Sequence, residues 1–245
     1  MNCSSQLLRS LVTLAAFAAT LGATLPVEAG VFSVTPVRMF MGPRDRAIAV
    51  TLTNEGDSEI VLQADINTWT QKPDGTDVLT LTEDLILSPP IIKLAPRGRQ
   101  VVRLALLKPA DASRQLTYRI IVREVPEVVA QKEGVQLPIA LALSMPVFIT
   151  PPVAKREVGC ELVRTSSGQA EAACSNSGSA YAQVRELSLQ RDGQTLASFE
   201  GGAYMLPGAR KVLPLKSERA LAAGPAQLGL TFDDGQSIKI NVTLP

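Results

Sequence analysis

The chain has 245 residues, and its 24 Lys and Arg against 23 Asp and Glu leave a formal net charge of only +1. This balance, without a run of basic residues, argues against nucleic acid or an anionic membrane as a partner. The absence of histidine removes the usual general base and the commonest metal ligand. Ser-His-Asp and Cys-His sites are excluded, and the sequence has no spaced carboxylate pair and no Gly-rich phosphate loop. We therefore expect no enzyme activity, no metal and no cofactor.

The N-terminal segment, residues 1–29, has the features of a secretory signal peptide. Arg9 precedes an apolar stretch from Leu11 to Leu21, and the pattern Val27-Glu28-Ala29 predicts cleavage before Gly30. That stretch is shorter than the roughly 18 apolar residues that a spanning helix needs, and no later stretch reaches that length. We expect an exported chain with no membrane insertion.

Without its signal peptide, the chain keeps two cysteines, Cys160 and Cys174. An oxidising compartment favours a disulfide between them. The pair lacks Cys-x-x-Cys spacing, and two cysteines without histidine cannot form an ordinary zinc site. We predict a structural disulfide that links the first two strands of a second domain.

Short apolar runs rich in Val, Ile, Leu and Thr recur about every 8 to 12 residues, separated by turn residues, and helical periodicity is nearly absent. This pattern predicts an all-β chain of two immunoglobulin-like β-sandwich domains at an angle, linked by a short hinge. In the first domain, residues 30–151, the expected strands are Val31–Met41, Ala47–Thr53, Ile60–Trp69, Ile91–Leu94, Gln100–Leu107, Thr117–Val125 and Val135–Thr150.

The hinge is predicted at Pro151-Pro152, because proline donates no backbone hydrogen bond and stiffens the chain. The second domain, residues 152–245, is predicted to be a smaller sandwich. Its expected strands are Glu157–Val163, Glu171–Ser175, Gln183–Gln190, Thr195–Phe199, Arg210–Leu215, Ala226–Phe232 and Ser237–Leu244.

The segment from Val135 to Pro151 is long for a strand of so small a domain. Large aliphatic residues occupy every second position at its start, so they share one face of a strand: Val135, Leu137, Ile139, Leu141 and Leu143. Pro138 on the opposite face removes one backbone donor, which favours an edge strand. Such a strand could complete an unfinished sandwich of a partner by β-augmentation. The alternative is that these aliphatic residues fill the core of their own domain, which is the default for an alternating strand. The length of the segment and Pro138 favour the first interpretation.

Nearly all of the chain after the signal peptide resembles the periplasmic chaperones of chaperone/usher fimbriae, the PapD-like proteins. The resemblance depends on several motifs in order: Ser33-Val34-Thr35-Pro36-Val37-Arg38, Val50-Thr51-Leu52-Thr53-Asn54, Pro89-Pro90-Ile91-Ile92-Lys93-Leu94-Ala95-Pro96, Gln100-Val101-Val102-Arg103-Leu104, Tyr118-Arg119 and Arg123-Glu124-Val125-Pro126. Each motif is weak alone, and their order makes the signature specific. The run Ser144-Met145-Pro146-Val147-Phe148 is more similar to the archaic, divergent branch.

The resemblance implies a function in which the last strand of the first domain enters the groove of a fimbrial subunit. It assigns this donor role to Val135, Leu137, Ile139, Leu141 and Leu143. It also implies that basic side chains in the interdomain cleft bind the subunit's C-terminal carboxylate, and Arg38 matches the first of them. The lysine that common members carry near the end of the donor strand is missing, and Arg119 is the candidate substitute. The alternative for Arg119 is a solvated strand arginine or an ion pair. We interpret Trp69 and Phe148 as core packing, and Lys93, Arg103 and Arg123 as framework or surface charges.

The expected partners are fimbrial subunits in the periplasm and an outer-membrane usher, and the free chain could cap itself as a homodimer. One alternative is a fimbrial structural or adhesive subunit, or another exported two-domain binding module. A pilin, however, should lack its last strand and carry a free N-terminal extension. An enzyme that uses Lys or carboxylate chemistry is the third hypothesis.

Overall fold

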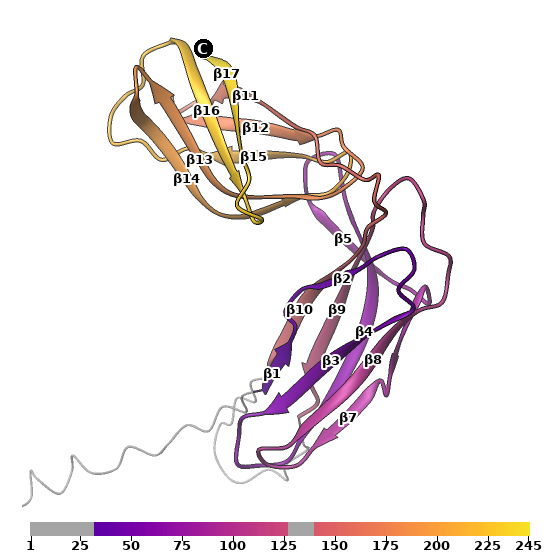
Figure 1. Ribbon diagram of the computed structural model, residues 1–245. Helices are drawn as coiled ribbons and strands as arrows, with labels where there is room; N and C mark the ends of the chain where they lie inside the picture. The colour runs from indigo at the N-terminus through magenta and orange to yellow at the C-terminus, as the bar shows by residue number, and fades with distance from the viewer. Residues whose placement is uncertain (1–31, 127–139) are drawn as a thin grey trace, which may run out of the picture.

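The computed structural model describes residues 32–126 and 140–245. The predicted signal peptide and the predicted donor residues Val135, Leu137 and Ile139 lie outside the described residues. Every regular element in the described part of the chain is a β-strand, in two sandwiches that meet at an angle (Figure 1). The predicted all-β, two-domain fold is confirmed. Within residues 32–126 and 140–245, no helix is long and apolar enough to cross a membrane.

The first sandwich packs two sheets face to face. In order across the first sheet lie β1 (Phe32–Thr35), β3 (Ala47–Asn54), β8 (Arg99–Leu106) and β6 (Leu85–Ser88). The second sheet contains β2 (Met39–Met41), β10 (Ala142–Ile149), β9 (Leu116–Glu124), β4 (Ile60–Gln71) and β5 (Asp77–Leu81), and β7 (Ile91–Leu94) also pairs with β4. Alternate residues of both sheets form one core; in β8 these are Val102, Leu104 and Leu106.

The prediction of a single strand over Val31–Met41 is wrong, because the chain forms two strands there, β1 and β2. β1 pairs with β3 in one sheet, whereas β2 pairs in parallel with β10 in the other. The chain changes sheets between Thr35 and Met39, where Pro36 cannot donate a backbone hydrogen bond. Strands β5 and β6 were not predicted from the sequence. Turn residues and polar positions interrupt the apolar pattern there.

The second sandwich follows the predicted pattern more closely. One sheet consists of β11 (Val158–Arg164), β12 (Ala170–Asn176) and β15 (Arg210–Pro214), and the other of β14 (Gln194–Met205), β13 (Ala182–Arg191), β16 (Gly224–Phe232) and β17 (Ser237–Leu244). β14 continues well beyond the predicted end at Phe199, through Gly201 and Gly202 to Met205. The predicted hinge prolines lie in the segment between β10 and β11.

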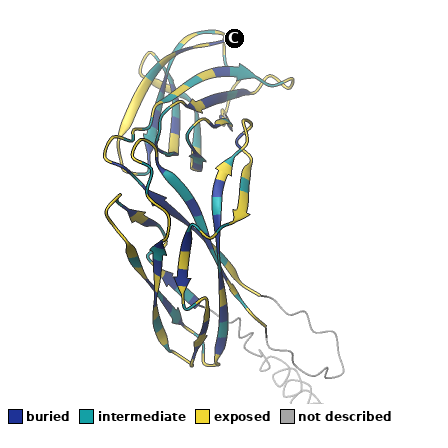
Figure 2. Ribbon diagram, turned by 90° about the vertical axis from the view of Figure 1, so that its right-hand side faces the viewer, coloured by how far each residue is buried: buried dark blue, intermediate teal, exposed yellow. Residues whose placement is uncertain are grey.

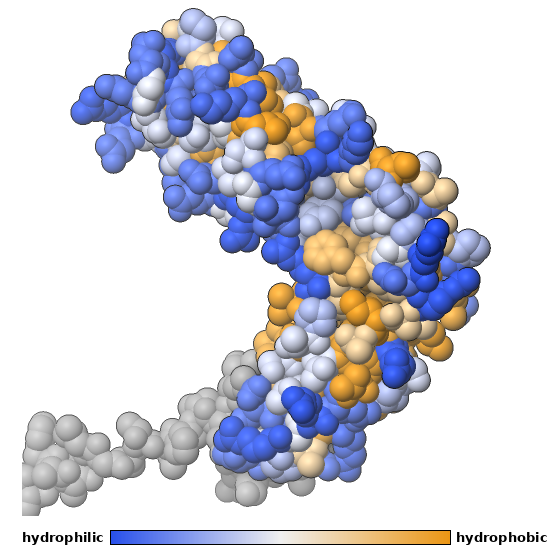
Figure 3. All heavy atoms as spheres, viewed as in Figure 1, coloured by the Kyte–Doolittle hydropathy of each residue, from blue (hydrophilic) through white to orange (hydrophobic). Residues whose placement is uncertain are grey.

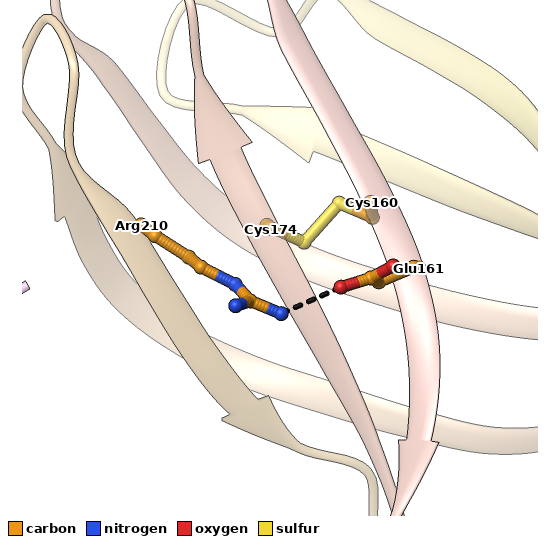
Figure 4. The surroundings of a disulfide bond; sticks show 4 residues. All are labelled: Cys160, Glu161, Cys174 and Arg210. Carbon is orange, nitrogen blue, oxygen red and sulfur yellow. Dashed lines mark hydrogen bonds and ion pairs between the residues drawn. A yellow bond between two sulfur atoms is a disulfide. The ribbon is translucent and has the colours of Figure 1, made fainter. Parts of the chain in front are cut away.

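The predicted disulfide between Cys160 and Cys174 is present and joins β11 to β12. The two cysteines are directly opposite each other in the antiparallel ladder (Figure 4). Beside them, Arg210 of β15 forms an ion pair with Glu161 at 2.5 Å. Both charged side chains are more than half exposed, so we expect little stabilisation from this pair. Cys174 is fully buried in the core of the second sandwich, which agrees with a structural role.

The two sandwiches contact each other through the β4–β5 hairpin as well as through the linker. Gln71, at the end of β4, donates from Nε2 to the carbonyl of Tyr204 (3.1 Å) and accepts from the backbone N–H of Leu206 (2.8 Å). At the tip of the hairpin, Gly75 lies against the backbone of Arg210. Figure 1 shows β5 reaching the second sandwich beside β15.

Candidate functional site between the two sandwiches

The strand β10 has a partly open edge. Along its whole length β10 pairs with β9, but on its other side β2 covers only Val147–Ile149. Among the described residues, Ala142–Pro146 therefore have a strand partner on one side only. Pro146 sits in this open part, where its missing N–H breaks no ladder. This geometry agrees with the edge position expected for the strand.

Leu141 and Leu143 are the two predicted donor residues that the structure describes. Leu141 precedes β10 and is 37% exposed, and its carbonyl accepts a 2.9 Å hydrogen bond from the N–H of Glu124. Leu143 is half-buried and packs against the core of its own domain. In the structure, Leu143 thus matches the alternative that the aliphatic residues fill their own core. The donor role stays a prediction for both residues.

The outer face of the β9–β10 sheet carries the aromatic joint between the domains. Trp69 and Phe148 are fully buried, although neither belongs to the core of either sandwich. They pack instead against Tyr181, Tyr204 and Leu206 of the second domain. The rings of Phe148 and Tyr181 are stacked, with centroids 4.0 Å apart. The predicted core packing of Trp69 and Phe148 agrees with this burial, but the cluster that they form joins two domains. Figure 2 shows how buried and exposed residues are distributed over both sandwiches.

Arg38 lies between β1 and β2 and reaches across to the second domain. Its Nη1 is 2.5 Å from Oδ2 of Asp233 and donates to Oε1 of Gln183 at 3.0 Å. The hydroxyl of Tyr181 donates to the same Asp233 oxygen at 2.9 Å. Burial, together with this bond to Asp233, raises the pKa of Tyr181, which therefore stays a neutral donor. Because only 32% of the Arg38 side chain is exposed, Arg38 is a partly desolvated cation at the domain junction.

Arg119 is directly opposite Pro146 in the β9–β10 ladder. Its guanidinium carbon lies 4.0 Å from the centroid of the Trp69 ring, and Nη1 donates to the hydroxyl of Ser144 at 3.2 Å. Its Nε is buried, and it has no hydrogen-bond partner among the residues that the structure describes. A guanidinium held over an indole ring, with one N–H still without a partner in the described part of the chain, can bind an anion.

Sequence reasoning missed the contribution of the second domain to this site. Gln183, Tyr181, Tyr204 and Asp233 all lie beside Arg38 or Arg119. Asp233 is 195 positions from Arg38 along the chain, and Asp233-Asp234-Gly235 has the composition of an ordinary turn. No local signal indicates that the first aspartate of this turn faces another domain.

The remaining predicted framework charges lie away from the joint. Lys93 pairs with Glu59 at 2.8 Å, and Arg123 pairs with Asp65 at 2.8 Å. Arg103 is exposed on β8. Within residues 32–126 and 140–245, no group of His, Cys, Asp and Glu could hold a metal ion.

A hollow of about 820 Å³ opens beside the aromatic joint and is lined by both domains. Phe40, Gln115, Arg156 and Asp233 contribute to its wall, but Arg38 and Arg119 do not. In Figure 3, apolar surface is concentrated on the first domain next to the bend. The open edge of β10 and the two arginines, rather than this hollow, define the candidate site.

Comparison with known proteins identifies the family of the chain. Residues 31–155 match the family model of the pili and flagellar-assembly chaperones, PapD N-terminal domain. No curated protein sequence matches the chain.

Solved structures extend the similarity of fold to both domains. The chain is similar to a structure of the CsuC-CsuE chaperone–tip adhesion subunit pre-assembly complex from the archaic chaperone-usher Csu pili of Acinetobacter baumannii. The TM-score is 0.64 at 19% identity, over 88% of this chain and 99% of the other. It is also similar to the Salmonella enterica SafA pilin in complex with the SafB chaperone (TM-score 0.59, 14% identity, 89% and 99% covered). The Pseudomonas aeruginosa CupB2 chaperone is a third example (TM-score 0.56, 17% identity, 87% and 100% covered).

The family match covers slightly more than half of the chain and includes every strand of the first sandwich. The chain belongs to the family of pili and flagellar-assembly chaperones.

Proposed function

We propose that this protein is a periplasmic chaperone that binds fimbrial subunits by donor-strand complementation and delivers them to an outer-membrane usher. The observation that carries the proposal is the open edge of β10 at Ala142–Pro146, next to two cations at the domain junction. Two of the similar structures are complexes of a chaperone with a subunit, which supports a pilin or adhesin as the partner.

Binding would begin with the backbone of β10 and of the residues before it. A subunit that lacks one strand has an apolar groove bounded by unpaired strand edges, which makes it prone to aggregate. An edge strand of the chaperone can complete the ladder, while its aliphatic side chains fill the groove. Burying three Leu or Ile side chains contributes about 5 to 9 kcal/mol before ordering costs. Such binding needs no catalysis and no nucleotide.

The two arginines would fix the register of the added strand. A one-residue slip would move every side chain of a strand to the opposite face, so a fixed anchor is valuable. Arg38 and Arg119 would bind the C-terminal carboxylate of the subunit with charge-assisted hydrogen bonds. Arg119 is opposite Pro146 in the ladder, which lets a cation from β9 serve where the donor strand carries none.

Co-purification from the periplasm tests this proposal. Wild type, Arg38→Ala and Leu141→Glu are each co-expressed with candidate fimbrial subunits, and folding is checked by circular dichroism. We expect a stable one-to-one complex with wild type, and its loss in both folded variants. Undiminished capture by both variants would remove the site assignment and favour a different binding surface.

Lys239→Ala is a suitable control, because Lys239 is an exposed cation on β17 of the second sandwich. This variant should capture subunits as wild type does. A usher-dependent release assay, with the purified complex and an outer-membrane fraction that contains the usher, would test delivery separately.

A further inference from the structure

A third arginine, Arg185, reaches the same junction from the second domain. It lies in β13 at a β-bulge, because the register shifts between Val184 and Glu186 in the ladders with both β14 and β16. Arg185 is therefore unpaired in both ladders. A bulge twists the strand and re-aims the side chain of the extra residue, and bulges are frequent next to binding sites.

The space around Gly202 places the Arg185 guanidinium close to Gln183. Gln183 pairs with Tyr204 in the ladder. A Cβ added to Gly202 would lie 3.0 Å from Nε2 of Gln183 and 3.9 Å from Nη1 of Arg185. Burial raises the pKa of Tyr204, and the positive charges of Arg38, Arg119 and Arg185 oppose this rise. Both distances from the Gly202 Cβ are measured from the same point, so Arg185 lies close to Gln183, which accepts a hydrogen bond from Arg38.

The three arginines differ in their partners. Asp233 pairs with Arg38, and Arg119 is held by Trp69 and Ser144. Arg185 is exposed, and within the described part of the chain its side chain has no hydrogen-bond or ion-pair partner. Glu186 and Glu200, which are opposite each other on β13 and β14, form no ion pair with Arg185. An exposed guanidinium without a partner among the described residues, close to the Arg38 site, can bind a further carboxylate.

We propose that Arg185 is a third cationic contact for the subunit and binds a carboxylate of its C-terminal segment. This inference rests on the proposed function and adds a specificity-determining residue from the second domain. The carboxylate is either the terminal one or the side chain of an acidic residue close to the subunit's end. Because Gly202 has no side chain, there is space beside Arg185 for a carboxylate, and a Cβ at position 202 would reduce that space.

Trp69 provides a direct readout, because it is the only tryptophan of the chain and lies beneath the Arg119 guanidinium. The probe is a synthetic peptide with the last twelve or so residues of a captured subunit. Its binding is titrated by Trp69 fluorescence in wild type, Arg185→Ala, Arg185→Lys and the control Lys239→Ala. Peptides without tryptophan are used, so that the signal comes from the chaperone.

We expect Arg185→Ala to weaken peptide binding about tenfold, the typical size of one lost charge-assisted contact. Arg185→Lys should recover part of the affinity, and Lys239→Ala should match wild type. With a C-terminal amide peptide, the difference between wild type and Arg185→Ala disappears if Arg185 binds the terminal carboxylate. A second peptide has Asn or Gln in place of each Asp or Glu near its C-terminus. With this peptide, the affinity difference between wild type and Arg185→Ala disappears if Arg185 binds an acidic side chain. Either result supports the proposal.

Equal binding by wild type and Arg185→Ala, together with loss of binding in Arg38→Ala, would overturn this inference and leave the proposed function intact. Failure of wild type to capture any subunit in the co-purification would instead overturn the proposed function, and this inference with it. Because Arg185 is exposed, Arg185→Ala should melt at the wild-type temperature. Gly202→Ala is a second variant, and it should also weaken peptide binding while every charge is kept.

Discussion

Arg38 of the first domain and Asp233 of the second form an ion pair that spans the domain junction, and Tyr181 donates to the same carboxylate. The Asp233 side chain is only 7% exposed. In the free protein, the first predicted anchor therefore already has an anionic partner. A subunit carboxylate would share or replace it.

We predict that Asp233→Asn lowers the free energy of unfolding by about 1–2 kcal/mol, because a charge-assisted bond is lost while Arg38 remains partly solvated. The domains should also unfold less cooperatively, which differential scanning calorimetry would detect as a broader or divided transition. Asp234→Asn is the matched control, since Asp234 pairs with Arg156 and is far more exposed. A larger loss from Asp234→Asn would contradict the importance of the junction pair.

Loss of the Phe148 ring from the aromatic joint should strongly lower the free energy of unfolding. Phe148 is fully buried between Trp69 and Tyr181, so Phe148→Ala should cost about 3–5 kcal/mol, as for other buried aromatic residues. Urea denaturation monitored by circular dichroism would measure it. Phe40 also stacks on Phe148, with ring centroids 5.5 Å apart, but is 54% exposed. Phe40→Ala should therefore cost much less, and equal losses would argue against a buried joint.

Gly75 in the β4–β5 hairpin and Gly193 in the β13–β14 hairpin allow backbone strain to be distinguished from a contact between the domains. Gly75 and Gly193 have φ of 80° and 79°, which disfavours any other residue. A Cβ at Gly75 would lie 2.6 Å from the carbonyl oxygen of Arg210 in the other domain, whereas a Cβ at Gly193 would contact nothing within 4 Å.

Gly193→Ala should therefore cost only the backbone strain, about 1 kcal/mol. Gly75→Ala should cost more, and it should also change the angle between the domains. Thermal unfolding gives the first quantity, and small-angle X-ray scattering gives the second. An unchanged scattering profile for Gly75→Ala would show that the hairpin does not set the angle.

The carboxyl group of Asp84 predicts an acid-dependent contribution to stability. Burial opposes its ionisation, but the bonds from Lys108 and from the Tyr118 hydroxyl outweigh burial and hold the pKa of Asp84 below its usual value of 3.8. A folded pKa below the unfolded one stabilises the fold above the unfolded pKa, and this stabilisation is lost as the pH falls through the folded pKa.

Asp84→Asn should thus be less stable than wild type at pH 7, with a difference that shrinks below about pH 4. Urea midpoints at pH 7 and pH 3 measure both values. Glu83→Gln, a change at the exposed neighbouring residue, should show little difference at either pH. A constant difference between wild type and Asp84→Asn would mean that packing, rather than charge, is responsible.

The sequence predicted most of the fold because sandwich strands have local signals. In the second domain β17 was predicted with its observed bounds, Ser237–Leu244, because a turn precedes it and alternation continues to its end. β14 was predicted too short. It contains Gly201 and Gly202, and glycine is uncommon inside strands. The break between β1 and β2 depends on which sheet each half joins, and that choice is made by long-range pairing.

The candidate site was predicted only from the first domain. Arg38 and Arg119 have motif signals of their own, and the ladder places Arg119 opposite Pro146, where a donor-strand cation is missing. Asp233, Tyr204 and Arg185 could not be predicted. Their proximity to the arginines depends on the angle between two domains and on a bulge in β13, neither of which leaves a local trace in composition or periodicity.

The short length of β2 sets the stability of the free protein against its capacity to bind a subunit strand. It closes β10 at Val147–Ile149 and ends there. Each further residue of β2 that paired with β10 would stabilise the free protein. It would also occupy a position at which the strand of a subunit pairs in the proposed function. Under the proposed function, we therefore expect relatives that bind their subunits more tightly to have a β2 no longer than this one, and relatives that bind them more weakly to have a longer β2.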